Sequence, residues 1–480
     1  MSGQTTGEKV DLATLFAEDL GRVHVIGIGG VGMLGVARLL LTRGIPVTGS
    51  DIKEWPALET LRALGATIYL GQAAENLANI DTVIYSTAIP VDNVELAEAR
   101  RRGLRVLHRA EALVTAMNGR QVVAIAGTNG KTTTTSMTTT VLQHCGVDPS
   151  FFIGGEFADA GVGAHHGSGQ HFVVEADESD RSFLLYSPFA AILTNLEADH
   201  LNTYGDMAGL EAAFRQFVDR VDPAGFVVVC ADDPGAARLG EYARSTGRKV
   251  YSYGRAPEAD LRLTEETSDA AGTAYVAVLD GVPLGVVTVP VPGIHLALNS
   301  AASLLTAVRL GLEPQKAAES LAQFRGVRRR FELKGVAAGV RVYDEYAYHP
   351  SSMTAALTTL RVLAGTGRLL VAFQPYRMYR TVAFQDEIAQ ALGMADEVVV
   401  MEVFGPGEER GPGQGGAPLA RAVPLPPEHV VFEPSWSAVA AEVVGRVRPG
   451  DLVVTMGAPP ISMLGAEILA ALEEQPGLVS

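Results

Sequence analysis

The stretch Val122-Val-Ala-Ile-Ala-Gly-Thr-Asn-Gly-Lys-Thr-Thr-Thr-Thr135 combines an apolar run, a glycine loop and a row of threonines. The apolar run predicts a buried strand, and the threonine row predicts the first turns of a helix. Gly127 and Gly130 have no Cβ, so the backbone can fold closely around an anion with its N–H groups pointing inward. A helix that begins here adds a dipole that favours negative charge. The stretch therefore predicts a phosphate-binding loop.

Two side chains of this stretch have the chemistry of a nucleotide site. Lys131 would neutralise charge on the β- and γ-phosphates, and the Thr132 hydroxyl would bind Mg²⁺. The general phosphate-loop pattern has a glycine where this chain has Ile125, so the pattern is met only in part. The alternative interpretation is a glycine-threonine turn with an exposed lysine. The predicted strand before the loop and the helix after it favour the nucleotide.

Length and composition limit the class of protein. The chain has 480 residues, of which 47% are hydrophobic and 19% charged, as expected for a globular protein of about three domains. No apolar run reaches the ~18 residues of a membrane span, and the polar, acidic first residues do not resemble a secretion signal, so we expect a cytoplasmic protein without membrane contact. The net charge of −16 disfavours nonspecific binding to nucleic acid. Cys145 and Cys230 are expected to be buried thiols.

A second glycine loop lies near the start of the chain. Gly27, Gly29 and Gly32 form G-x-G-x-x-G directly after a short apolar run. The next predicted strand ends at Asp51, at about the spacing at which a dinucleotide-binding fold places a ribose-binding carboxylate. Taken alone, these features indicate NAD. The alternative is a glycine loop that only packs a helix against a sheet.

Two acidic stretches follow predicted strands in the middle of the chain. They are Glu175-Ala-Asp-Glu-Ser-Asp180 and Asn195-Leu-Glu-Ala-Asp-His200. Ligands of open α/β sheets bind outside the carboxyl ends of the strands, so both stretches are expected to face the loop at Lys131. Carboxylates suit Mg²⁺ held against phosphates, although a histidine ligand is unusual for this ion. Solvated acidic loops are the alternative. Three histidines of the same region are expected to be exposed and inert, namely His165, His166 and His171.

The pattern of apolar runs predicts an α/β protein of three domains. Strand-like runs with helices between them occur at 81–87, 104–108, 171–176, 190–195, 225–231, 340–346, 368–374, 397–404 and 451–456. Alternating strands are expected over 261–291, a helix over 294–310, a linker at 328–331 and a mobile Gly/Pro-rich loop over 405–427. We predict a Rossmann-like domain at 1–118, a central P-loop ATPase-type mononucleotide-binding domain at 119–326 and a Rossmann-like α/β domain at 327–480.

Two nucleotide-type loops in successive domains, followed by a third α/β unit, suit an enzyme that joins two substrates. From about Val23 to the end, the chain resembles the Mur ligase family. The motifs that carry the resemblance are Gly27-Ile-Gly-Gly-Val-Gly-Met33, Gly127-Thr-Asn-Gly-Lys-Thr132, Glu175-Ala-Asp-Glu-Ser-Asp180, Thr194-Asn-Leu-Glu-Ala-Asp-His-Leu-Asn-Thr-Tyr-Gly205, Arg329-Arg-Phe331, Gln374-Pro-Tyr-Arg-Met-Tyr-Arg-Thr381 and Met456-Gly-Ala458. Within the family, the chain is most similar to the branch that uses L-alanine.

The resemblance implies a reaction. ATP phosphorylates the lactyl carboxylate of UDP-N-acetylmuramate, and the amine of an amino acid, L-alanine in this branch, attacks the acyl phosphate to give an amide and phosphate. The product is a precursor of peptidoglycan. The first domain would then bind a UDP-sugar rather than NAD, the second ATP with Mg²⁺, and the third the amino acid. The expected partners are these small molecules, and the expected assembly is a monomer or homodimer.

The resemblance also implies roles for the residues at the matching motif positions. The catalytic set is Lys131, Glu175, His200 and Arg330, and the metal ligands are Thr132, Glu175 and His200. ATP is assigned to Gly127, Thr128, Asn129, Gly130, Lys131, Thr132, Thr133, Asn299, Arg330 and Glu345. The UDP-sugar is assigned to Gly29, Gly30, Gly32, Met33, Asp51 and Ser86, and the amino acid to Tyr346, Tyr348, Arg377 and Arg380.

Several positions depart from the family pattern, most of them in the predicted amine-binding domain. Glu345 stands where an aspartate is expected, Tyr348 and Tyr376 stand where histidines are expected, and Pro459-Pro460 replaces a glycine and a polar residue. These changes leave three alternatives open. The chain is a paralogue with a different amine such as glycine or L-serine, a noncatalytic nucleotide-binding protein, or, from the first glycine loop alone, an NAD-dependent dehydrogenase.

Overall fold

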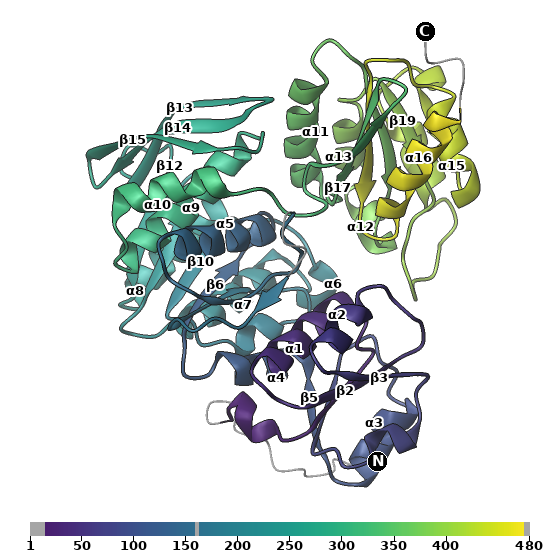
Figure 1. The fold of residues 1–480 in the computed structure, drawn as a ribbon. Coiled ribbons are helices and arrows are strands. Elements are labelled where there is room, and N and C mark those ends of the chain that lie inside the picture. The colour runs from purple at the N-terminus through teal and green to yellow at the C-terminus, as the bar shows by residue number, and fades with distance from the viewer. Residues whose placement is uncertain (1–14, 159–162, 475–480) are drawn as a thin grey trace. The chain divides into compact units, whose positions relative to one another are not determined.

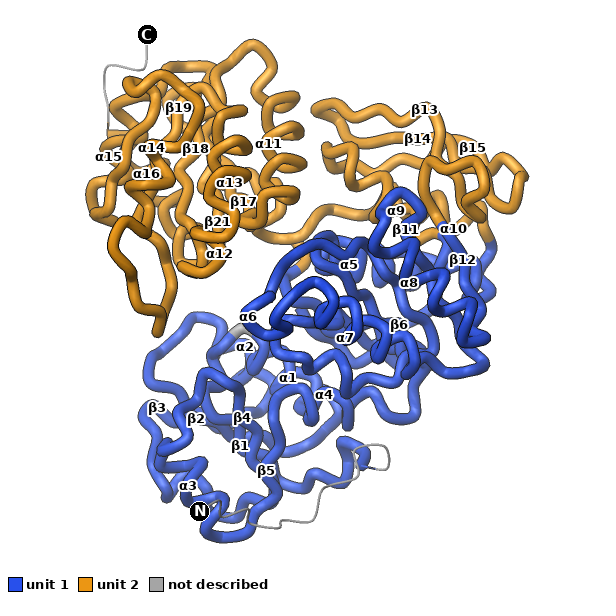
Figure 2. Tube along the Cα trace, turned by 180° about the vertical axis from the view of Figure 1, so that it is seen from behind, with its two compact units in different colours: residues 1–156, 162–252, 305–313 blue, residues 157–161, 253–304, 314–480 orange. Residues whose placement is uncertain are grey.

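The computed structural model describes residues 15–158 and 163–474, which divide into two compact units (Figure 2). Unit 1 comprises residues 1–156, 162–252 and 305–313, and unit 2 comprises residues 157–161, 253–304 and 314–480. The expected boundaries at 118 and 326 fall inside these units, so the division into three domains at those residues stays a prediction.

The N-terminal part of unit 1 is built on five parallel strands in the order β3-β2-β1-β4-β5. Figure 1 labels β2, β3 and β5 of this sheet. The strands are β1 (Val23–Ile26), β2 (Val47–Asp51), β3 (Thr67–Leu70), β4 (Thr82–Tyr85) and β5 (Arg105–His108). The helices are α1 (Val31–Thr42), α2 (Leu58–Ala63), α3 (Val94–Arg101) and α4 (Arg109–Met117). The strand order reverses between β1 and β4, and ligands of such sheets bind at this switch point. The glycine loop after β1 lies there.

Ten strands form the second sheet, in the order β15-β14-β13-β12-β11-β10-β6-β9-β7-β8. The strands of its unit 1 part are β6 (Gln121–Ala126), β7 (Ser150–Phe152), β8 (Ala164–His165), β9 (His171–Glu175), β10 (Ala190–Leu193) and β11 (Phe226–Cys230). The unit boundary falls within β12 (Lys249–Gly254), after which come β13 (Leu261–Asp269), β14 (Gly272–Leu279) and β15 (Val282–Val289). The helices of this region are α5 (Lys131–His144), α6 (Leu201–Tyr204), α7 (Met207–Asp219), α8 (Pro234–Ser245), α9 (His295–Arg309) and α10 (Pro314–Ser320).

The C-terminal part of unit 2 has a six-stranded sheet in the order β16-β17-β21-β18-β19-β20, parallel except for β16. The strands are β16 (Glu332–Ala337), β17 (Val340–Glu345), β18 (Leu369–Gln374), β19 (Glu397–Val400), β20 (Val430–Phe432) and β21 (Leu452–Gly457). The helices are α11 (Pro350–Ala364), α12 (Met378–Ala383), α13 (Gln385–Leu392), α14 (Gly416–Ala422), α15 (Trp436–Val444) and α16 (Leu464–Glu473). Short 3₁₀ helices complete the chain: η1 (Ala17–Leu20), η2 (Ala74–Leu77), η3 (Ser182–Leu185), η4 (Leu321–Gln323), η5 (Pro427–His429) and η6 (Ile461–Met463).

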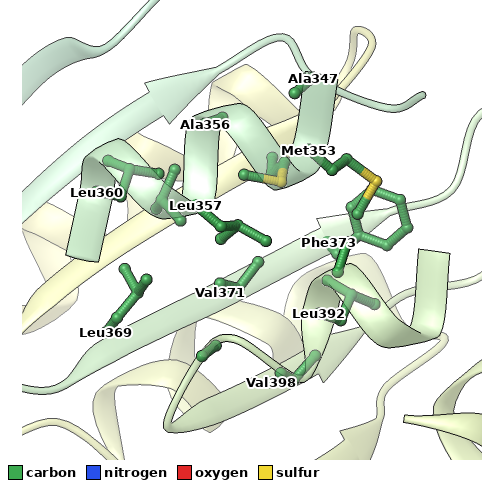
Figure 3. Close-up of a cluster of buried hydrophobic side chains, with 14 of the residues drawn as sticks. Ala347, Met353, Ala356, Leu357, Leu360, Leu369, Val371, Phe373, Leu392 and Val398 are labelled. Carbon is green, nitrogen blue, oxygen red and sulfur yellow. The ribbon is translucent and has the colours of Figure 1, made fainter. Parts of the chain in front are cut away.

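Two apolar layers cover the faces of this C-terminal sheet. Successive side chains of a strand point to opposite faces, so Leu369, Val371 and Phe373 of β18 join one layer and Leu370 and Ala372 the other. The first layer packs against α11, α13 and α14. Figure 3 shows its residues from α11, β18, α13 and β19. The second packs against α15 and α16. The residues of β18 are buried throughout, as expected for a central parallel strand with helices on both faces.

The predicted α/β class and the predicted strands are confirmed, but three local expectations are wrong. The Gly/Pro-rich tract 405–427 contains α14, whose Leu419 is fully buried, so a mobile loop over the whole tract is incorrect. His171 was expected to be exposed, but it is buried in β9, where burial lowers its pKa. Cys230 is buried as expected, whereas Cys145 is only partly buried at the end of α5. In the described parts of the chain, no helix is both long and apolar enough to cross a bilayer.

Candidate active site

The predicted phosphate loop connects β6 to α5. Gly130 is the residue before the helix and has φ 84°, and Gly127 has φ 136°, both in the left-handed region that favours glycine. A Cβ on Gly127 would lie 2.1 Å from the Thr194 hydroxyl oxygen, so another residue there would push the loop away from β10. The strand, the tight loop and the helix start therefore have the arrangement that the sequence predicts.

Lys131 folds back over this loop. Its Nζ donates to the carbonyl oxygens of Gly127 at 2.6 Å and Thr128 at 3.1 Å and forms an ion pair with Glu178 at 2.9 Å. Burial by itself lowers the pKa of Lys131. The negative charges of Glu178, Asp177 and Glu175 have a larger opposite effect, so the pKa of Lys131 is raised overall. The ammonium group therefore stays charged at the centre of the loop, where an anion would meet it.

Thr132 and Glu175 form the second contact between the loop and the first acidic stretch. The Thr132 hydroxyl lies 3.1 and 3.0 Å from the two carboxylate oxygens of Glu175, and Glu175 also accepts the Gly154 N–H at 2.9 Å. A hydroxyl and a carboxylate are hard oxygen ligands, so this donor set fits Mg²⁺. His200 precedes α6 with φ 52°, and its Nε2 lies 3.5 Å from Asp199. Among the described residues, no group of three or more His, Cys, Asp or Glu side chains is arranged to hold a metal ion.

The second acidic stretch contacts the loop from β10. Asn195 accepts the Asn129 N–H at 2.8 Å and donates to the Asn129 carbonyl at 3.0 Å. Glu197 receives a hydrogen bond from the Asn129 amide at 3.3 Å, and its own N–H donates to Thr128 Oγ1 at 2.9 Å. The prediction that both acidic stretches face the loop is thus confirmed, while the binding roles of their residues stay predictions.

Two side chains without a predicted role, Trp55 and Arg109, pack against the N-terminal glycine loop. A Cβ on Gly29 would lie 2.3 Å from Cδ1 of Trp55, and a Cβ on Gly32 would lie 2.5 Å from Nη1 of Arg109. Asp51 accepts the Gly29 N–H at 2.9 Å. Of the other predicted UDP-sugar residues, Gly30 precedes α1, Met33 is buried in it, and Ser86 follows β4.

Three of the predicted ATP residues, Asn299, Arg330 and Glu345, belong to unit 2, and two of them contact each other. Arg330 lies 3.6 Å from Glu345, whose carboxylate also accepts the N–H groups of Phe331 at 2.9 Å and Ala347 at 3.2 Å. Burial raises the pKa of Glu345, and Arg330 opposes that rise. Glu345 thus ties the backbone of the Arg329-Arg-Phe331 segment to the end of β17, a role that the sequence did not predict. Asn299 is nearly buried in α9, where its carbonyl accepts the Ser303 hydroxyl at 3.0 Å.

The predicted amino-acid residues lie together in an aromatic–arginine cluster, which comprises Tyr346, Tyr348, Tyr376, Arg377 and Arg380. The ring of Tyr348 lies 5.6 Å from that of Tyr346 and 5.3 Å from that of Tyr376. The Arg380 guanidinium is 4.6 Å from the Tyr348 ring, and its side chain is only 1% exposed. The two tyrosines that depart from the family pattern therefore contact each other and the same arginine. The Pro459-Pro460 peptide bond after β21 is cis.

Comparison with known proteins covers all three parts of the chain. The matching family models are Mur ligase family, catalytic domain at residues 22–121, Mur ligase middle domain at 125–307 and Mur ligase, glutamate ligase domain at 329–459. The chain is 61% identical to a UDP-N-acetylmuramate--L-alanine ligase from Salinispora arenicola, over 98% of this chain and 92% of the relative. It is 51% identical to the protein of that name from Acidothermus cellulolyticus, over 95% of this chain and 96% of the relative.

Solved structures extend the comparison to the fold. UDP-N-acetylmuramate-alanine ligase MurC from Thermotoga maritima is 27% identical, with a TM-score of 0.77 over 94% of this chain and 98% of that chain. A murein peptide ligase from Psychrobacter arcticus, at 24% identity, shares the fold with a TM-score of 0.71 over 95% of this chain and 99% of that chain. From the family models and these relatives together, the chain belongs to the Mur ligase family.

Proposed function

We propose that this protein is an ATP-dependent ligase that joins L-alanine to the carboxylate of UDP-N-acetylmuramate through an acyl phosphate, in the synthesis of peptidoglycan precursors. The observation that carries the proposal is the loop at Lys131, where a charged lysine, a threonine hydroxyl and a glutamate converge on one helix start. The names of the relatives from Salinispora arenicola and Acidothermus cellulolyticus support the choice of substrates.

In the proposed reaction, the chain's residues bring two anions together. A lactyl carboxylate oxygen attacks the γ-phosphorus, the bond between that phosphorus and the β,γ-bridging oxygen breaks, and ADP leaves. Lys131 holds the phosphates and offsets the charge that develops on the transferring group. Thr132, Glu175 and His200 would hold Mg²⁺, which when bound screens the repulsion between carboxylate and phosphate. The L-alanine amine then attacks the acyl carbon, phosphate leaves with the acyl-bound oxygen, and the nitrogen loses a proton.

The assignment extends to each domain. The Rossmann-like domain, residues 1–118, binds the UDP-sugar at Gly29, Gly30, Gly32, Met33, Asp51 and Ser86. The central domain, 119–326, binds ATP, and the C-terminal domain, 327–480, holds the L-alanine carboxylate with Arg377 and Arg380 beside Tyr346 and Tyr348. The proposed compartment is the cytoplasm, where UDP-sugars and ATP are available.

Release of phosphate tests the proposal directly. Purified protein is incubated with UDP-N-acetylmuramate, Mg-ATP and one amino acid from a panel that includes L-alanine, glycine, L-serine and L-leucine. We expect phosphate release that needs every component, is highest with L-alanine, and stops when EDTA removes Mg²⁺. Preference for glycine or L-serine would instead identify a paralogue with another amine. No ADP with any amine would identify a noncatalytic nucleotide-binding protein.

A matched pair of lysine variants links the activity to the loop. Lys131→Met removes the ammonium that donates to Glu178 and the loop carbonyls, and we expect kcat to fall on the order of 10²- to 10³-fold. Lys249→Met, at an exposed position, is the control and should retain wild-type activity.

A dehydrogenase is not supported, because the chain belongs to the Mur ligase family. NADH should accordingly bind no more tightly than other nucleotides.

A further inference from the structure

Trp55 is an exposed aromatic residue beside the N-terminal glycine loop. It lies in the connection between β2 and α2, and 43% of its surface is exposed. Its indole N–H donates to Asp51 Oδ1 at 3.1 Å. Gly29 lies so close to the ring that a Cβ there would be 2.3 Å from Cδ1. The five-membered edge of the indole is therefore held against the loop.

Asp51 has a second role in these contacts. One carboxylate oxygen accepts the Gly29 N–H at 2.9 Å, and the other accepts the Lys53 N–H at 3.2 Å and the Trp55 indole N–H. These three internal hydrogen bonds use most of the roughly four acceptor positions of a carboxylate. Asp51 consequently holds the glycine loop and Trp55 in one arrangement.

The fold places the indole where a nucleotide base would lie. Phosphates of ligands in such domains lie at the N-terminus of the first helix, here α1, and the rest of the ligand extends past the carboxyl ends of the neighbouring strands. The segment after β2 follows one of those ends and carries Trp55. The Lys53 ammonium is 6.0 Å from the indole centroid, at the limit of a cation–π contact. Because Trp55 is 43% exposed, part of its surface is open to a ligand.

We propose that Trp55 is the stacking platform for the uracil base of the sugar nucleotide, a role that rests on the proposed function. Stacking on an aromatic ring tolerates any base, because every base has a π-face. Trp55 therefore contributes to affinity for the nucleotide rather than to the choice of base. Asp51 and Gly29 also fix the Trp55 ring before the ligand arrives.

Intrinsic fluorescence tests the contact, because the chain has only two tryptophans. Trp436→Phe leaves Trp55 as the single tryptophan. UDP should change the emission of this variant in a saturable manner, at the concentrations where calorimetry detects binding. Inorganic pyrophosphate, which lacks a base, should leave the emission unchanged. If calorimetry shows that UDP binds while the Trp55 emission stays constant, the proposal is wrong.

Two variants separate the ring from its hydrogen bond. Trp55→Leu and Trp55→Phe both lose the indole N–H, but only phenylalanine retains an aromatic face. The Kd for UDP-N-acetylmuramate should rise roughly tenfold in Trp55→Leu and less than about threefold in Trp55→Phe. Circular dichroism with thermal unfolding checks that both variants fold. An unchanged Kd in Trp55→Leu, with normal L-alanine ligation by the wild type, overturns this proposal alone. Failure of the wild type to bind UDP-N-acetylmuramate overturns the proposed function as well.

Discussion

Burial and the positive charge of Lys131 have opposite effects on the pKa of Glu178. Glu178 is 2% exposed, one carboxylate oxygen accepts from Lys131 at 2.9 Å, and the other has no hydrogen-bond partner among the described residues. Burial raises the pKa of Glu178 to about 7, although the Lys131 ammonium lowers it. A proton can thus bind to this carboxyl group near neutral pH, which changes the net charge beside Lys131.

This raised pKa predicts how stability depends on pH. In the unfolded chain the carboxyl titrates near 4.5, so its contribution to folding is complete below that pH and is lost as pH rises through about 7. Glu178→Gln removes this titration. Between pH 5.5 and 8, the free energy of unfolding should therefore fall by on the order of 1 to 3 kcal/mol more in the wild type than in the variant, as measured by thermal unfolding. Glu75→Gln, at an exposed position, is the control. Parallel pH profiles for wild type and Glu178→Gln would contradict the prediction.

Sequence reasoning located the residues of the phosphate loop but not the partners that fold back onto them. Gly127, Gly130 and Lys131 are recognisable because the loop needs those residue types at that spacing. Glu178 lies in the acidic stretch that was identified, yet only the structure shows that its carboxylate, rather than another, contacts Lys131. Asp51 stays a predicted UDP-sugar residue, and the structure adds that it accepts hydrogen bonds from Gly29 and Trp55. Which of several neighbouring polar groups makes a contact depends on side-chain geometry, and the spacing of residues in the sequence does not determine that geometry.

At the scale of elements, periodicity predicted the buried strands well because their apolar runs are continuous. It failed for α14, since glycine and proline between residues 405 and 415 conceal a helix that packs into the C-terminal core with Leu419. Burial of Leu419 against the sheet, and not the intrinsic preference of that segment, accounts for this helix.

The core beneath α11 gives a stability prediction. Leu357 is fully buried between α11 and β18, and its side chain lies in the apolar cluster of Figure 3. Leu357→Ala should destabilise unit 2 by about 2 to 5 kcal/mol, because it removes buried methyl groups and leaves a cavity. Val362→Ala lies on the same helix at a position that is 46% exposed and should cost well under 1 kcal/mol. Urea unfolding followed by circular dichroism measures both. Equal effects of the two variants would show that this layer is not the core of the C-terminal part.

The aromatic–arginine cluster gives a prediction for amine binding. Tyr348 contacts Arg380 and the ring of Tyr376, so Tyr348→Ala removes one support of the guanidinium. We expect the KM for L-alanine to rise about tenfold with a smaller change in kcat, because the carboxylate contact is made in the ground state and the transition state alike. Tyr348→Phe preserves the ring and should remain within about threefold of the wild type. If the KM for L-alanine of Tyr348→Ala equals the wild-type value, the aromatic–arginine cluster does not take part in binding the amino acid.

The proposed binding sites of the protein lie in two compact units. The glycine loops, Lys131 and Trp55 belong to unit 1, whereas Arg330, Glu345 and the aromatic–arginine cluster belong to unit 2. The five-stranded sheet belongs to unit 1 and the six-stranded sheet to unit 2, whereas the ten-stranded sheet crosses the boundary within β12. Ligand binding to the five-stranded sheet should therefore have a measurable local effect. A ligand stabilises only the folded structure to which it binds, by about 2.7 kcal/mol at a concentration one hundred times its Kd.

Hydrogen exchange followed by mass spectrometry therefore provides the last prediction. With UDP-N-acetylmuramate alone, amides of the loop after β1, of the segment 52–57 and of the start of α1 should exchange more slowly, because the ligand stabilises the structure that holds them. Amides of β18 and β21 in unit 2 should exchange as in the free protein until ATP and L-alanine are added. Trp55→Leu, at UDP-N-acetylmuramate concentrations that saturate both proteins, should show less protection in segment 52–57 and unchanged protection at the start of α1. Slower exchange in β18 with the UDP-sugar alone would instead show that the two units respond to this substrate as one body.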